Sequence, residues 1–190
     1  HDQSSAASDV YKRQDKKSTI GLHPHQGFEI CSFILEGSIN HFDTKQDKWI
    51  SLNKGDVQII RAGNGISHAE ELNEKSEIFQ IWFDPNIQLS ITKEASYDDY
   101  KSDDFEVIEN NGTKTKKIAG KNCPMKIFSE GIEINSYEIT EKNKLSLQLQ
   151  NDSVYSYFIL DGEGSINNDK IEKGDFFIVS DSEDLKINTN

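Results

Sequence analysis

Short apolar stretches separated by polar turns run through most of the chain, and strand-like alternation is commoner than helical periodicity. In the first half, the expected strands cover residues 28–35, 38–42, 48–52, 57–60, 66–70 and 78–83. Polar or glycine-containing turns lie between them, at intervals of about ten residues. Many short strands with such turns predict an all-β sandwich or barrel.

The pattern divides the chain into segments. Residues 1–14 show neither strand-like alternation nor helical periodicity, and we expect them to be disordered or foreign to the natural protein. Residues 15–90 form the expected N-terminal domain, and residues 91–122 are polar and predict a linker between domains, with a short strand at 105–108. Residues 123–190 form the C-terminal domain, with strands at 126–128, 132–139, 145–149, 153–160, 164–166 and 175–179. Because a strand pattern still runs at 185–190, we expect a fragment cut at both ends.

The two halves share short sequences in the same order. Residues 33–37 (FILEG) match residues 158–162 (FILDG), and residues 54–56 (KGD) match residues 173–175 (KGD). Between them, Ser38-Ile39 matches Ser165-Ile166 after a two-residue insertion. Repeated β units with the same turn chemistry predict an internal duplication.

Charge and cysteine content exclude some functions. The net charge is −12, which repels phosphates, so we expect no direct nucleic-acid binding and no attraction to anionic membranes. No apolar run approaches the roughly 20 residues of a membrane helix. The two cysteines, Cys31 and Cys123, form no CxxC pair and predict reduced thiols in a cytoplasmic protein.

Two short patterns of metal-ligand residues stand out. His23 and His25 are two residues apart, as are His68 and Glu70, and residues i and i+2 of a strand point to the same face. Two such pairs on neighbouring strands can aim four ligands at one point, and this donor set suits Fe, Mn, Ni, Cu or Zn. The alternative is that they are polar side chains on a solvent face, because a single HxH pair is weak evidence.

The sequence around these patterns resembles a known family. Residues 21–37 read GLHPHQGFEICSFILEG and residues 55–70 read GDVQIIRAGNGISHAE, which resemble the two cupin motifs in the form found in pirins. Arg61 replaces the proline of a general cupin, as pirins also show. The resemblance implies a bicupin of two small antiparallel β-barrels, with His23, His25, His68 and Glu70 as ligands of one divalent metal ion, usually Fe(II).

Two other residues of the first half need an interpretation. Glu29 has the parity of His23 and His25, so a regular strand places it on their face. There it orients a histidine N–H or acts as a catalytic base, unless it is a solvated strand residue. His41 is expected to be exposed or to line the pocket rim. Aromatic residues are expected mainly in the core, although some can stack on a planar substrate: Phe28, Phe33, Trp49, Phe79 and Trp82.

The second half lacks these ligands. No histidine lies beyond residue 68, and aligning Phe33 with Phe158 places Gln148, Gln150 and Val154 where His23, His25 and Glu29 stand. We therefore expect a metal-free C-terminal domain with a structural role.

The resemblance implies a dioxygenase that cleaves a flavonol such as quercetin with O2. Glu70 or Glu29 then takes the flavonol proton. The alternative is a metal-dependent redox sensor or regulator that acts through a protein partner without turnover, and the acidic surface suits a basic partner. A third reading is another cupin activity, such as isomerisation. The oligomeric state is left open.

Overall fold

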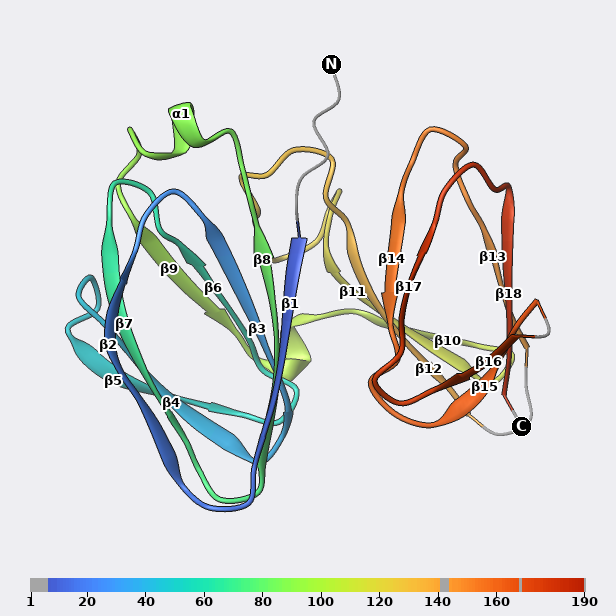
Figure 1. The fold of residues 1–190 in the computed structure, drawn as a ribbon, viewed down its shortest axis with the longest axis horizontal. Helices are drawn as coiled ribbons and strands as arrows, with labels where there is room; N and C mark the ends of the chain where they lie inside the picture. The colour runs from blue at the N-terminus through green and yellow to red at the C-terminus, as the bar shows by residue number, and fades with distance from the viewer. Residues whose placement is uncertain (1–6, 141–143, 168, 190) are drawn as a thin grey trace. The chain divides into compact units, whose positions relative to one another are not determined.

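The computed structural model describes residues 7–140, 144–167 and 169–189, and their regular structure is nearly all antiparallel β-strand (Figure 1). The chain divides into two compact units. The first comprises residues 1–106 and 117–134, and the second comprises residues 107–116 and 135–190. The predicted all-β class with two β units is confirmed.

The first unit contains two sheets that enclose its core (Figure 1). One has the order β1-β8-β3-β6-β9, made of β1 (Ala7–Gln14), β8 (Ser76–Phe83), β3 (Glu29–Glu36), β6 (Val57–Arg61) and β9 (Ser96–Tyr100). The other has the order β2-β7-β4-β5, made of β2 (Ser18–His25), β7 (Ile66–Leu72), β4 (Ser38–Asp43) and β5 (Lys48–Asn53). A short helix α1 (Ile87–Ser90) and a 3-10 turn η1 (Ser102–Asp104) connect strands at the edges.

Among the described residues, two apolar clusters lie between the two sheets of the first unit, with a polar layer of side chains around β7. Residues of one cluster are Ile30, Ile60, Ala62, Ile66, Ala95 and Tyr97. Residues of the other are Ile34, Ile39, Leu52, Leu72 and Ile78. Each cluster takes side chains from both sheets, so burial of apolar surface holds the sheets together at two levels.

The second unit has a smaller buried core. Its sheets are β13-β18-β15-β16 and β14-β17, made of β13 (Lys144–Gln148), β18 (Asp184–Thr189), β15 (Glu163–Ile166), β16 (Asp169–Glu172), β14 (Tyr155–Phe158) and β17 (Phe176–Val179). Only Leu145, Leu185 and Ile187 of its core cluster are buried among the described residues, and their apolar neighbours are half-buried. A third sheet, β10-β11-β12, is made of β10 (Val107–Asn110), β11 (Thr113–Ala119) and β12 (Ile134–Ile139).

The duplication is visible in the hydrogen bonds of the matching turns. In the first unit, Lys54 N donates to Gly37 O at 3.0 Å and Gly55 N donates to Ile34 O at 2.8 Å. In the second unit, Lys173 N donates to Gly162 O at 3.0 Å and Gly174 N donates to Ile159 O at 2.8 Å. Both central glycines have positive φ, +87° for Gly55 and +94° for Gly174, which glycine adopts without strain.

The predicted two-residue insertion in this repeat is wrong. Ser38 is paired with Asn53, whose N–H donates to the carboxylate of the KGD aspartate, Asp56. In the second unit, Glu163 pairs with Glu172, whose N–H donates to Asp175. Glu163, not Ser165, is therefore the equivalent of Ser38, and the two units differ in the length of the hairpin that follows. Similar residue types at Ser165-Ile166 misled the alignment.

The predicted segment boundaries need correction too. Residues 7–14 form β1, which pairs with β8 along its whole length; residues 1–6 lie outside the described residues. Most of the predicted linker 91–122 is structured. Ser96–Tyr100 is β9, which pairs with β6, and Tyr97 is buried in the first core despite its acidic neighbours. Composition alone indicated a linker because β9 is an edge strand with a polar outer side.

The boundary at residue 123 is likewise displaced. Residues 117–134 belong to the first unit, and residues 107–116 belong to the second. Residues 126–128 are not a strand, and a bridge between Ala119 and Met125 is the β pairing found there. Side-chain hydrogen bonds of Glu29 and Arg61 hold residues 126–129 to the first unit. The alternation of apolar and polar residues does not reveal such contacts.

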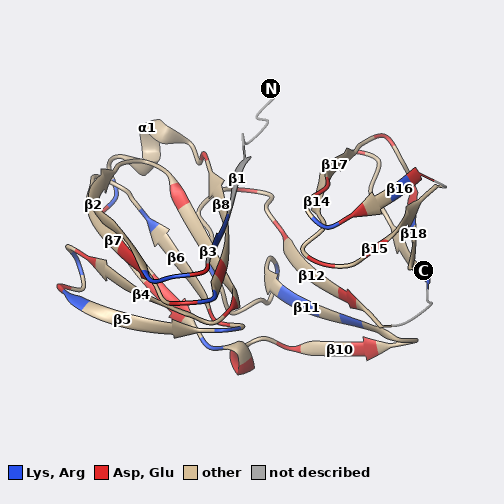
Figure 2. Cartoon of the chain, turned by 60° about the horizontal axis from the view of Figure 1, so that its bottom comes forward, with Lys and Arg blue, Asp and Glu red and all other residues tan. Residues whose placement is uncertain are grey.

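Charged residues occur on the strands of both units (Figure 2). In the β10–β11 pair, acidic Glu109 stands opposite basic Lys114. Within the described residues, no helix has the length and apolar character needed to cross a membrane. Cys31 and Cys123 are both buried and unpaired, as predicted.

Candidate metal centre

Strand β7 carries the centre of the candidate site. His68 and Glu70 point to the same inner face, with 2% of each residue exposed. β7 has β2 on one side and β4 on the other, so two strands deliver side chains to this pair. His23 of β2 is registered with His68, while His41 and Asp43 of β4 are registered with Glu70 and His68.

A bulge in β2 sets the direction of its histidines. Ile20 pairs with Glu70 and His23 pairs with His68, so three steps along β2 match two along β7. Such a bulge re-aims the side chains that follow it. Leu22 is left 59% exposed, while His23 and His25 point inward from alternate positions, as predicted.

The rings of His23, His25 and His68 meet at one place. Their centroids are 4.8 Å apart for His23 and His25, 4.4 Å for His23 and His68, and 4.9 Å for His25 and His68. The three residues offer ligand nitrogens within 4.8 Å of one another. His23 Nδ1 donates to Gly21 O at 2.8 Å, which leaves Nε2 to bind a cation.

Glu70 lies beside His68, and its ligand atom is close to that of His41 rather than to those of His23 and His25. The ligand atoms of Glu70, His68 and His41 also lie within 4.8 Å of one another. His41 is fully buried, so the expectation that it is exposed or on a rim is wrong. The physical reason is strand alternation: Ile39, His41 and Asp43 occupy the inner face of β4, and their neighbours face outward.

Burial favours the neutral form of two histidines of the site, His68 and His25. It lowers the pKa of His68 to about 3, with further lowering by His23, His25 and His41. Burial and the nearby His23 also lower the pKa of His25. A neutral imidazole has one lone pair, which is the form that binds a metal.

The residues present fit a metal ion. Buried ring nitrogens of the site have no hydrogen-bond partner among the described residues: His25 Nε2, His41 Nδ1, His68 Nδ1 and His68 Nε2. An unsatisfied buried polar atom costs about 1–3 kcal/mol, so several at one point indicate a missing partner. Imidazole nitrogens with one carboxylate form a donor set for a first-row divalent metal.

A buried polar network orients Glu70. Gln80 Nε2 donates to Glu70 Oε1 at 2.9 Å and Gln58 Nε2 approaches it at 3.4 Å. Both glutamines also donate to Ser32 Oγ, and Tyr97 OH donates to Gln58 at 3.4 Å. Burial raises the pKa of Glu70, which makes it a stronger base than an exposed glutamate.

Glu29 lies in a different network. β2 ends at His25, and the turn through Gly27 (φ +84°) starts β3 in the opposite sheet, so parity does not carry from His25 to Glu29. Its carboxylate accepts from Phe128 N and Ser129 N, each at 2.7 Å, and from Ser129 Oγ at 2.6 Å. Glu29 therefore anchors residues 128–129, and no histidine among the described residues is its hydrogen-bond partner.

Arg61 completes this anchor. Its Nε donates to Lys126 O at 3.1 Å and lies 3.9 Å from Glu29 Oε1, and its Nη1 bonds Asp98 at 2.6 Å. The guanidinium of Arg61 is also 5.2 Å from the centroid of the Phe128 ring. Residues 126–129 are thus held by a buried ion pair rather than by strand pairing.

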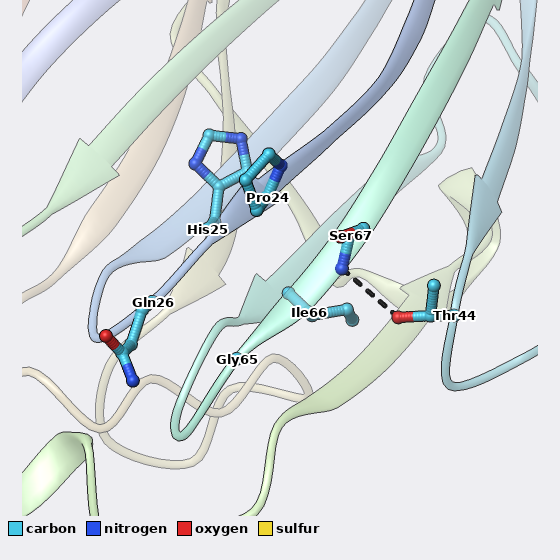
Figure 3. A pocket seen from close by; sticks show the side chains of 7 residues that line it. All are labelled: Pro24, His25, Gln26, Thr44, Gly65, Ile66 and Ser67. Carbon is cyan, nitrogen blue, oxygen red and sulfur yellow. Dashed lines mark hydrogen bonds between the residues drawn. The ribbon is translucent and has the colours of Figure 1, made fainter.

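A pocket of about 500 Å³ opens beside His25, a size that suits a drug-sized ligand (Figure 3). Its walls come from the ends of β2 and β7 and from the turn after β4, where Ser67 N donates to Thr44 Oγ1 at 3.1 Å. The lining residues are Pro24, His25, Gln26, Thr44, Gly65, Ile66 and Ser67. His25 belongs both to this pocket and to the histidine trio.

Aromatic residues next to the site are only partly core. Trp82 packs edge-on against His25, with ring centroids 4.9 Å apart, and the ring centroids of Phe28 and Trp82 are 6.3 Å apart. Phe33 and Phe79 are buried as expected, but Phe28 is 38% exposed and Trp49 is 50% exposed. For these two residues the core expectation is wrong.

Sequence reasoning missed several residues of the site. His41, Asp43, Gln58, Gln80 and Tyr97 carry no local motif that marks them as functional. Strand alternation gave a weak indication that His41 and Asp43 are buried, because they share a face with the apolar Ile39. Their partner strand, β7, could not be inferred from the sequence.

Comparisons with known proteins agree with this arrangement. Residues 2–83 match the family described as Pirin. Pirin-like protein 2 of Arabidopsis thaliana is 36% identical over 132 residues, which cover 67% of this chain and 37% of that protein. A putative quercetin 2,3-dioxygenase of Zymomonas mobilis is 44% identical over 69 residues, covering 35% of this chain and 29% of that protein. The chain thus spans about a third of the length of these relatives.

Solved structures show the same fold. A quercetin 2,3-dioxygenase from Acinetobacter baumannii superposes with a TM-score of 0.81 at 21% identity, covering 97% of this chain and 68% of that one. The bacterial pirin YhhW from Escherichia coli, in complex with nickel(II), has a TM-score of 0.74 at 20% identity, covering 96% and 76%.

The fold and the histidine cluster define a bicupin with a candidate metal centre in its first unit. The family match and the relatives identify this chain as a member of the pirin family.

Proposed function

We propose that this chain binds one divalent metal ion in its first unit and acts as a dioxygenase on a flavonol such as quercetin. The observation that carries the proposal is the cluster of buried ring nitrogens without partners around His68. Fe(II) is the expected metal, with Mn, Ni, Cu and Zn as alternatives that the same donor set accepts.

We assign His23, His25, His68 and Glu70 as the metal ligands. The three histidines offer ring nitrogens within 4.8 Å of one another, and Glu70 lies next to His68 on the same face of β7. A bound ion of this kind supplies Lewis acidity and open coordination positions for substrate and O2.

The protein groups position the substrate and its proton. The pocket beside His25 gives a planar aromatic substrate access, and Trp82 and Phe28 offer ring faces and edges near it. Glu70 is the base that takes the flavonol hydroxyl proton, because burial raises its pKa. Glu29 is not retained in this role, since its carboxylate is occupied by Phe128 and Ser129.

The test is reconstitution with Fe(II) followed by metal analysis and oxygen uptake. We expect one equivalent of iron and quercetin-dependent O2 consumption, both lost in His68→Ala. Thr19→Ala, an exposed change on β2, is the control and should retain both. Absence of bound metal after reconstitution overturns the proposal, while metal binding without O2 uptake overturns the dioxygenase activity alone.

A further inference from the structure

His41 has the features of a metal ligand, although the predicted ligand set does not include it. It is fully buried on β4, directly opposite Glu70 in the register. Its Nε2 donates to Asp43 Oδ2 at 2.8 Å, and its buried Nδ1 has no hydrogen-bond partner among the described residues. Because Nε2 carries the proton, Nδ1 presents a lone pair.

Asp43 fixes the orientation of this ring. Its Oδ1 accepts from Lys45 N and Gln46 N, each at 2.7 Å, so the carboxylate cannot turn away from His41. The His41 ring also stacks on Tyr97, with centroids 4.6 Å apart and an angle of 9° between the planes. A carboxylate that holds the far nitrogen of a histidine is the usual support of a metal-binding imidazole.

The groups close to the His41 ring are electron-pair donors. His68 and Glu70 offer ligand atoms within 4.8 Å of that of His41 and of each other. All three residues are buried, whereas two members of the outer trio, His23 and His25, are half-exposed. A divalent cation placed between these three donors satisfies all of them at once.

We propose that His41, His68 and Glu70 form an inner position for a divalent first-row metal, deeper than the outer trio of His23, His25 and His68. This inference rests on the metal binding proposed above, since both positions use His68. A neutral imidazole has only one lone pair, so His68 serves one ion at a time. The two positions are therefore alternatives for a single ion.

Cobalt(II) titration of purified protein tests the inner position, with calorimetry for affinity and visible absorption for ligand geometry. The double variant His23→Gln with His25→Gln removes the outer trio and leaves the inner one intact. We expect it to bind one equivalent of Co(II), with affinity about 10–100-fold below wild type. Adding His41→Gln to this double variant abolishes binding.

Two outcomes overturn the inner position: a folded double variant that binds no Co(II), and binding that is unchanged by the added His41→Gln. The second outcome means that His68 and Glu70 bind Co(II) without His41. Wild-type protein that binds no Co(II) overturns the general metal-binding proposal as well, so the two failures are distinguishable. If the double variant does not fold, the single variant His23→Gln with and without His41→Gln gives the same comparison.

Two further variants serve as controls. Asn40→Ala changes the next residue on β4, which faces outward and bonds Glu71 and Ser51, and it should leave Co(II) binding unchanged. Asp43→Asn keeps His41 but loses the carboxylate behind it. In the double variant, we expect Asp43→Asn to weaken Co(II) binding by about 10–100-fold, a loss that Asn40→Ala does not cause.

Discussion

The two units share a turn but differ in what their strands enclose. Residues 54–56 and 173–175 make the same backbone hydrogen bonds, and the aspartates of both turns accept from the residue three positions earlier. Among the described residues, the first unit encloses buried histidines and two apolar clusters, while the second has three buried residues in its core cluster. The turn chemistry therefore specifies the β unit, and the site depends on side chains that the turn does not influence.

The largest difference between the units is expected at Glu29. Glu29→Ala leaves the N–H groups of Phe128 and Ser129 without their acceptor and removes the buried carboxylate 3.9 Å from Arg61, which keeps Asp98 as its partner. We expect a loss of about 3–5 kcal/mol in the free energy of unfolding, measured by denaturant titration. The equivalent residue of the second unit, Val154, is 70% exposed. Val154→Ala should change stability by no more than about 0.5 kcal/mol, and a similar loss at both positions would contradict the comparison.

Core packing gives the next largest contrast. Leu52 is fully buried, while its equivalent after the hairpin, Ile171, is half-buried around a smaller core. We expect Leu52→Ala to cost about 2–5 kcal/mol and Ile171→Ala to cost about half as much. Hydrogen exchange of amides in each unit reports the two losses separately. Equal losses would show that the second core is as tightly packed as the first.

Metal affinity sharpens the comparison at one residue. His68 contributes to both groups of ligand atoms, so His68→Gln should weaken Co(II) binding by at least about 100-fold, or roughly 2.7 kcal/mol. The second unit has no histidine, and Asp184→Ala in β18 should leave the affinity unchanged. Calorimetry checks both values. Binding retained in His68→Gln would place the metal elsewhere in the chain.

The smallest expected difference lies in the shared turn. Asp56 accepts from Asn53 N at 3.0 Å, Lys101 Nζ at 3.0 Å and Ser102 N at 3.2 Å, and it is 5% exposed. Asp175 is exposed and accepts from Glu172 N at 2.8 Å. We expect Asp56→Ala to cost about 2 kcal/mol and Asp175→Ala about 0.5–1 kcal/mol in thermal unfolding. The reverse order would mean that the turn alone, without its added partners, carries the stability.

Local pattern was sufficient for much of the fold. Alternation located most strands of the first unit to within two residues, and the KGD turns revealed the duplication. The pairs His23–His25 and His68–Glu70 were predictable because strand alternation depends on neighbouring positions only. The geometry of the turns and the pairing of distant strands were not predictable from the sequence. Glu29 was misplaced because the chain turns at Gly27, and His41 was missed because its partner, Glu70, is on a strand that follows much later.

Polar composition concealed other elements. Ser96–Tyr100 is acidic on its outer side, yet Tyr97 packs in the core and stacks on His41. Residues 126–128 were predicted to be a strand of the second domain, but side-chain contacts of Glu29 and Arg61 place residues 126–129 in the first unit. Contacts of this kind join positions about one hundred residues apart, which no local period records.

The bulge between Ile20 and His23 has a consequence for how this strand tolerates a change in chain length. Three steps along β2 match two along β7, so deleting one residue there, such as Leu22, gives regular pairing with the first histidine still opposite His68. Side chains alternate with a period of two, and both histidines therefore stay on the inner face after such a deletion. Inserting a residue into the regular part of β2 is different, because it shifts the strand by one position and turns the histidines to solvent.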